Sequence, residues 1–180
     1  MKIEVNGVAV TGGQLRVDYR VQNTGAGPIY LLDQFWNIEG NAFALTPGYS
    51  YRYFHGPRLV LFRGVLDVPD GIKAEVPETP YAQRVLAGGT EARFLEVPVP
   101  VMRDTGYVGP VQEAAVATPV LELDLVLGYV PEGEIPDDWG LFEGEGGSLY
   151  SVDAGLALMV QKTVSARLPV PEGLTGYIPG

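Results

Sequence analysis

The stretch that decides the fold is QLRVDYRVQ, residues 14–22. Apolar side chains occupy every second position, and polar or charged side chains occupy the positions between them. This period of two predicts a strand with one buried face and one face in water. Turn-forming residues follow in NTGAGP, residues 23–28, and the apolar run IYLLDQFW resumes at residues 29–36. A hairpin or a corner connection between two strands is therefore expected here.

Further segments of the chain show the same strand patterns. RLVLFRGV at 58–65 is apolar on both faces and predicts a central strand, and shorter strands are expected in GIKAEVPE at 71–78 and EARFLEVPV at 91–99. PVLELDLVLGYV at 119–130 alternates, with Leu121 and the leucines at 123, 125 and 127 expected to point inward. LMVQKTVSARLPV at 158–170 alternates too, and Lys162 interrupts its inward face as in strands at a sheet margin.

Glycine and proline limit the helical content. The 24 glycines and 15 prolines are spread along the whole chain, so long helices have few places to form. Two short helices are expected, one in TPYAQRVLAGG at 79–89 and one in GPVQEAAVA at 109–117.

These patterns predict an all-β protein, namely an antiparallel immunoglobulin-like β-sandwich of about eight strands in a single domain, residues 1–180. A closed barrel is the alternative. Two long loop insertions are expected near residues 98–118 and 131–156, and loops of such length in compact domains are usually functional or mobile.

Two segments carry a resemblance to a superfamily. LRVDYRVQNTGAGPIYLL at 15–32 and VLAGGTEARFLEVPVP at 85–100 resemble parts of immunoglobulin-like β-sandwich domains of bacterial proteins. The resemblance covers about a fifth of the chain and implies adhesion, scaffolding, enzyme inhibition or carbohydrate recognition. The chain differs from antibody-type domains because it lacks the cysteine pair and exceeds their usual length of roughly 100 residues.

The composition excludes several classes of partner and chemistry. The formal net charge of −10 disfavours nucleic acid and anionic membranes as partners. The absence of cysteine excludes disulfides, zinc–thiolate sites and a thiol nucleophile. The chain begins without a signal-like apolar run, which predicts the cytoplasm, or the periplasm or secretion if a signal peptide has been removed.

Histidine is scarce, and this restricts catalysis. The one histidine, His55, excludes sites that need two imidazoles, and no nucleophile-elbow pattern surrounds any of the four serines. We expect no cofactor. Hydrolysis by paired carboxylates stays open, because the many acidic residues single out no particular pair.

An aromatic and basic segment at residues 49–58 is one candidate binding site. Its candidate residues are Tyr49, Tyr51, Arg52, Tyr53 and His55. In an extended segment the three tyrosines share one face, which suits a platform for sugar rings or for a partner protein. Alternatively, the same tyrosines cover one end of the core, with their hydroxyl groups at its rim.

The acidic stretch EGEIPDDWGLFEGEGG at 132–147 is a second candidate. Trp139 and Phe142 are its candidate binding residues, either buried against the sandwich or presented to a partner. Carboxylates of this stretch provide hard oxygen ligands, so calcium is an alternative, but the spacing is not that of an EF-hand loop and we predict no metal site. The residues of that calcium alternative are Asp137, Asp138, Glu143 and Glu145.

Together these features favour a non-enzymatic binding or protein-interaction module. The alternative is a carbohydrate-binding module or a carbohydrate-active hydrolase that uses paired carboxylates. A structural role in a larger assembly also fits, and the sequence leaves the oligomeric state open.

Overall fold

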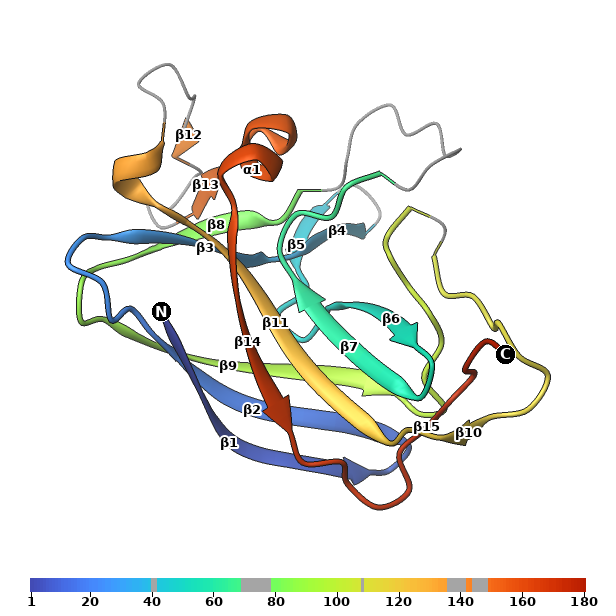
Figure 1. Ribbon diagram of the computed structural model, residues 1–180. Helices are drawn as coiled ribbons and strands as arrows, with labels where there is room; N and C mark the ends of the chain where they lie inside the picture. Colours follow the sequence, from blue (N-terminus) through green and yellow to red (C-terminus); the bar gives the residue numbers. More distant parts are fainter. Residues whose placement is uncertain (40–41, 69–78, 108, 136–141, 144–148) are drawn as a thin grey trace.

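The protein is built mainly from β-strands arranged in layers (Figure 1). The computed structural model describes residues 1–39, 42–68, 79–107, 109–135, 142–143 and 149–180. Its elements, in chain order, are β1 Lys2–Thr11, β2 Gln14–Gln22, β3 Ile29–Gln34, β4 Trp36–Glu39, β5 Ala42–Leu45, β6 Tyr51–His55, β7 Arg58–Arg63, β8 Tyr81–Val85, β9 Thr90–Pro98, β10 Thr118–Pro119, β11 Glu122–Pro131, the 3₁₀ helix η1 Glu132–Glu134, β12 Phe142–Glu143, β13 Leu149–Ser151, α1 Ala154–Val160, β14 Lys162–Leu168 and β15 Thr175–Gly176.

A three-stranded antiparallel sheet forms one layer, in the order β1-β2-β9. Its central strand β2 is the segment whose alternation predicts a half-buried strand, and that prediction is confirmed. Leu15, Val17, Tyr19 and Val21 are fully buried, whereas the charged residues between them face outward or are half-buried. The outer face of this sheet is therefore polar, and its inner face contributes to the main core.

The larger sheet has the order β12-β13-β8-β3-β11-β7-β6, and β14 also pairs with β11. Figure 1 shows β7, β11 and β14 crossing over the three-stranded sheet. The main core lies between the two sheets, where leucines of β7 and β11 pack with the inward side chains of β2 and β9. The prediction of an all-β fold is thus confirmed in its coarse form, since the described chain is mostly strands arranged in several sheets.

One strand pair departs from the predicted antiparallel arrangement. β7 and β11 are parallel, with Arg58 opposite Glu122 and Arg63 opposite Leu127. Parallel neighbours need a long crossover connection, and the chain between these strands supplies one because it passes through β8 and β9. As predicted, β7 is a central strand buried on both faces.

The opposite face of the larger sheet is also covered. Tyr30, Leu32, Ala82 and Val130 point to this side and pack against α1, together with Val65 and Val152. Asp153 caps α1 by accepting a hydrogen bond from the backbone N–H of Leu156, at 2.9 Å. The sequence pattern did not predict this helix, since its first residues were expected in a loop and its last ones in a strand.

Four other local predictions have clear outcomes. The helix expected at 79–89 is wrong, because residues 81–85 form β8 between β3 and β13, and the paired edges on both sides outweigh the local helix signals. Residues 109–117 contain no helix. Leu121 was expected inward but is 67% exposed, since β11 begins one residue later. Lys162 was expected in a strand at a sheet margin, and in the described residues its strand β14 pairs only with β11.

Candidate binding surface

The chain changes its burial pattern where β3 ends. The ladder between β3 and β8 shifts by one residue between Leu32 and Gln34, so that Asp33 is an extra residue in β3. Such a bulge redirects the side chains that follow it. Asp33 is fully buried, whereas Trp36, three residues later, is 40% exposed. The bulge therefore separates a buried polar region from the exposed hairpin formed by β4 and β5.

The hairpin places four large apolar side chains on one face. Trp36 is opposite Leu45 and Ile38 is opposite Phe43, and residues two apart in a strand share a face. The exposed fractions are 40% for Trp36, 61% for Ile38, 52% for Phe43 and 40% for Leu45. We call these four residues the hairpin apolar face. A contiguous exposed apolar surface of this kind marks an interaction site more often than scattered apolar residues do.

Aromatic packing and a hydrogen bond hold this face in place. The ring centroids of Trp36 and Phe43 are 5.8 Å apart, and the ring of Tyr81 lies 5.5 Å from that of Phe43 in an edge-on arrangement. The indole Nε1 of Trp36 donates a hydrogen bond to the carbonyl of Thr79 at 3.2 Å. The indole is thus fixed from one side while its other surface stays open to solvent.

Sequence reasoning missed the hairpin apolar face, although a signal for it exists. The segment WNIEGNAFAL, residues 36–45, alternates on both sides of Gly-Asn, a dipeptide typical of two-residue hairpin turns. Reading residues 29–36 as one continuous strand concealed that alternation. The exposure itself has no sequence signal, because an apolar strand face is usually buried.

A depression of about 260 Å³ adjoins the hairpin. Its lining includes Trp36, Asn37, Thr46, Tyr49 and Asp104, so aromatic rings, an amide, a hydroxyl and a carboxylate meet there. It therefore combines apolar walls with a few polar groups, the usual composition of a small binding site.

The floor of this region contains a buried ion pair. Arg52 and Asp104 are both buried, and the guanidinium Nη2 of Arg52 donates to Oδ2 of Asp104. The other carboxylate oxygen of Asp104 accepts hydrogen bonds from the Tyr49 hydroxyl at 3.0 Å and from the Gly106 N–H at 3.1 Å. A backbone bridge between residues 52 and 104 brings the stretch after β9 against the edge of β6. Asp104 was not predicted, because only the tertiary structure brings it to β6.

At its centre the tyrosine segment follows the alternative in which a tyrosine covers the core. Tyr51 is fully buried and its ring stacks on Phe62 with centroids 6.3 Å apart, so it cannot contact a ligand at the surface. Tyr53 is half-buried and contacts the exposed His55, with ring centroids 5.4 Å apart. Burial, and to a lesser degree Asp124, raise the pKa of Tyr53. Of the candidates in this segment, the structure brings Tyr49 and Arg52 together, at Asp104.

The second candidate site falls mostly outside the described residues. Asp137, Asp138, Trp139 and Glu145 are not described, and Phe142 and Glu143 are described only as the strand β12, with residue 142 opposite Ser151. The prediction for Trp139 and Phe142 therefore stays a prediction. Among the residues that the structure describes, no group of three or more acidic or histidine side chains is arranged to hold a metal ion.

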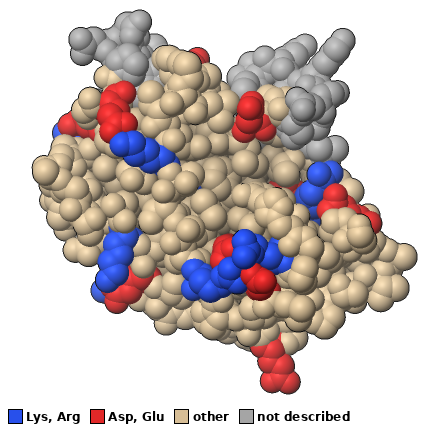
Figure 2. Space-filling model, viewed as in Figure 1, with Lys and Arg blue, Asp and Glu red and all other residues tan. Residues whose placement is uncertain are grey.

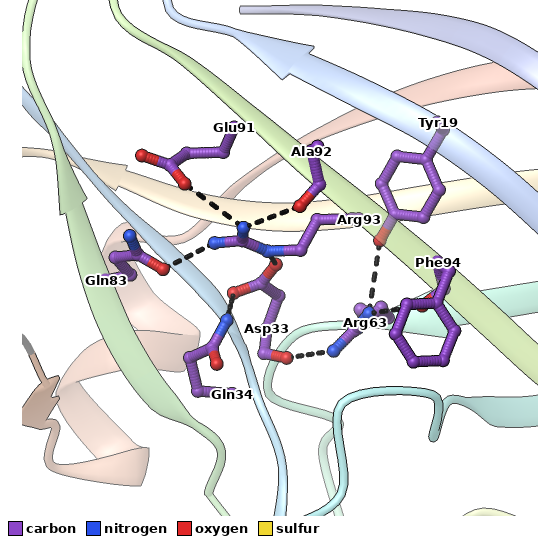
Figure 3. A network of polar contacts seen from close by, with 9 residues as sticks. All are labelled: Tyr19, Asp33, Gln34, Arg63, Gln83, Glu91, Ala92, Arg93 and Phe94. Carbon is purple, nitrogen blue, oxygen red and sulfur yellow. Dashed lines mark hydrogen bonds and ion pairs between the residues drawn. The ribbon is translucent and has the colours of Figure 1, made fainter.

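A network of buried charges lies on the other side of the bulge (Figure 3). Arg93 Nε donates to the carboxylate of Asp33 at 2.7 Å. Arg63 is fully buried, and it donates to the Tyr19 hydroxyl and the Phe94 carbonyl, each at 3.2 Å, and to the Asp33 carbonyl. Burial raises the pKa of Tyr19, against an opposing effect of Arg63. The network joins the two sheets, and its enclosed groups are not placed to meet a substrate.

Exposed charges are mostly paired. On the face shown in Figure 2, Lys and Arg side chains lie beside acidic ones and form no continuous basic area. Arg58 and Arg167 share Glu122, and Arg84 pairs with Glu132. In the part of the chain that the structure describes, no helix is long and apolar enough to cross a membrane.

Comparisons of the chain with protein-family models, with curated proteins and with solved structures found no match. The candidate site is therefore defined by its geometry alone, as an apolar hairpin face beside a small amphipathic depression.

Proposed function

We propose that this protein is a non-enzymatic protein-interaction module on an immunoglobulin-like sandwich, and that it binds its partner through the hairpin apolar face. The observation that carries the proposal is the position of Trp36, Ile38, Phe43 and Leu45 on one face of a two-stranded hairpin, each at least 40% exposed. A partner that covers these side chains removes them from water, which favours binding by a free energy of about 25 cal/mol for each Å² of apolar surface buried.

The geometry favours binding over a purely structural role. Aromatic anchors in the centre of a patch supply most of the binding energy in protein interfaces. Trp36 is held by its hydrogen bond to the Thr79 carbonyl and by its contact with Phe43, so little side-chain entropy is lost when a partner covers it. The hairpin thus offers an ordered surface before any partner arrives.

The test compares the wild-type chain with the double variant Ile38→Thr and Phe43→Ser. Leu121→Ser is the matched control, because it also removes an exposed apolar side chain but lies outside the hairpin. Partners are captured from cells of the source organism, purified, and titrated against each chain. We expect binding to the wild type and the control, and affinity at least about 100-fold weaker for the double variant. A purified partner that binds all three chains equally would contradict the proposal.

Carbohydrate binding is the second candidate function, and the depression beside the hairpin favours it. Aromatic rings of Trp36 and Tyr49 together with Asn37 and Thr46 suit a sugar ring, which has both apolar faces and hydroxyl groups. A glycan screen tests this candidate. Specific glycan binding that Thr46→Ala weakens, and that the double variant in the hairpin leaves intact, would select the carbohydrate function instead.

A further inference from the structure

The size of the hairpin apolar face restricts what can cover it. Four side chains at these exposures present on the order of 400 Å² of apolar surface, about half of the 800 Å² that each partner contributes to a stable interface between folded proteins. This area suits a short peptide segment better than a second folded copy of the chain.

The charge of the protein restricts the occupant further. The chain carries a formal net charge of −10, so two copies repel each other and an anionic membrane surface is also disfavoured. Asp104 lines the depression beside Trp36, and its ion-pair partner Arg52 is buried. Arg63, on the neighbouring strand β7, is fully buried as well. Arg52 and Asp104 neutralise each other in this pair, so the attraction for a basic segment comes from the net negative charge of the whole chain.

We propose that the hairpin apolar face binds a basic peptide segment, in which apolar side chains pack on Trp36 and Phe43 while flanking lysine or arginine residues are attracted by the net negative charge of the chain. The inference rests on the proposed function and deepens it by naming the class of partner. Apolar contact supplies most of the affinity, and the complementary charge supplies selectivity and faster association.

The experiment uses a phage-displayed library of random linear peptides and the full chain as bait. Peptides that also bind the double variant Ile38→Thr and Phe43→Ser are removed by counter-selection, after that variant has been shown to be folded by circular dichroism and urea unfolding. We expect the remaining peptides to be enriched both in Lys or Arg and in large apolar residues.

Synthetic peptides from the selection then provide the quantitative test. Phe43→Ser should weaken their binding at least about 30-fold. Raising NaCl from about 0.05 M to about 0.5 M should weaken it at least about tenfold, because the charge attraction is screened. Leu121→Ser should leave the affinity unchanged.

Two kinds of failure are distinguishable. Peptides that need the hairpin but carry no excess of positive charge, or bind equally well in high salt, would overturn this inference and leave the proposed function standing. A library without any hairpin-dependent peptide would also overturn this inference, and the titration of a captured partner against the double variant would then decide the proposed function. Concentration-dependent dimers of the wild type that Phe43→Ser abolishes in sedimentation velocity would show that a second copy is the occupant, and would also overturn the inference.

Discussion

Two neighbouring regions of this protein reverse the usual distribution of side chains. On one side of the bulge in β3, the charged groups of Asp33 and Arg63 are fully buried between the sheets. On the other side, Trp36 and the rest of the hairpin apolar face are open to water. Buried charge and exposed apolar surface both raise the free energy of the folded protein, but the two regions differ in how this is compensated.

Most polar atoms of the buried charges have partners within the chain, although Nε of Arg63 has none. Asp33 accepts from Arg93 and Gln34, and Arg63 donates to the Tyr19 hydroxyl and to two carbonyls. The hairpin apolar face has no equivalent compensation in the described residues, since each of its four side chains is at least 40% exposed. A buried network whose groups mostly bond to one another indicates a structural role, whereas an uncovered apolar face indicates a surface that something else covers.

The largest expected effect comes from breaking the buried network. Asp33→Ala should lower the free energy of unfolding by about 3–5 kcal/mol, because it removes the closer and fully buried of the two carboxylates that pair with Arg93 and leaves Glu91 as its remaining ion-pair partner. Urea unfolding measures the change. Asp18→Ala, which removes an exposed partner of Arg16, serves as the control and should leave stability close to that of the wild type. A loss below about 1 kcal/mol for Asp33→Ala would show that the network contributes little.

The pair beside the hairpin should show strong coupling. Arg52→Met and Asp104→Leu should each lower the free energy of unfolding by about 2–4 kcal/mol, since each leaves a buried charge without its partner. The double variant should lose less than the sum, with a coupling energy of about 2 kcal/mol in a double-mutant cycle. Additive losses would indicate that the two side chains act independently.

An alkaline pH should expose the contribution of Tyr19. Because burial raises its pKa above the usual value of 10.0, the folded state favours the neutral phenol, and the stability this provides is present below pH 10.0 and lost as the pH rises through the folded pKa. Urea midpoints measured between about pH 8 and about pH 11 should fall for the wild type. They should fall less for Tyr19→Phe, and equal slopes would contradict the prediction.

The smallest effect on stability should come from the hairpin. Phe43→Ala should cost about 1 kcal/mol or less, since roughly half of the ring is already in water. Phe62→Ala is the matched comparison, because that ring is buried in β7, and it should cost about 3–5 kcal/mol. Should Phe43→Ala destabilise the protein as much as Phe62→Ala, the hairpin would be part of the core and not a binding surface.

Some features of the fold could be predicted because they depend on local patterns. The alternation at 14–22 predicted a half-buried strand, and the apolar run at 58–65 predicted a central strand. The helix expected at 79–89 failed, because its start and stop signals are weaker than the pairing of β8 with β3 and β13. Local signals alone cannot report what lies beside a segment in space.

The candidate site likewise contains residues that the sequence predicted and residues that only the tertiary structure brings together. Tyr49 and Arg52 were predicted from their residue types, and the structure places both at Asp104. Tyr51 was a candidate binding residue with burial at the core as the alternative, and it is buried because it packs against Phe35 and Phe62. Asp104 is 52 positions from Arg52 along the chain, and no spacing rule connects residues that far apart.

The sequence by itself determined that this protein is made mainly of strands, that it is strongly acidic and that it has no thiol chemistry, since composition and period depend on residues alone. Only the tertiary structure decided the parallel pair β7 and β11, the buried pair at Asp104 and the exposure of the hairpin apolar face. Burial is a property of the three-dimensional surroundings. The same alternating pattern therefore lines the core in β2 and faces water in β4 and β5.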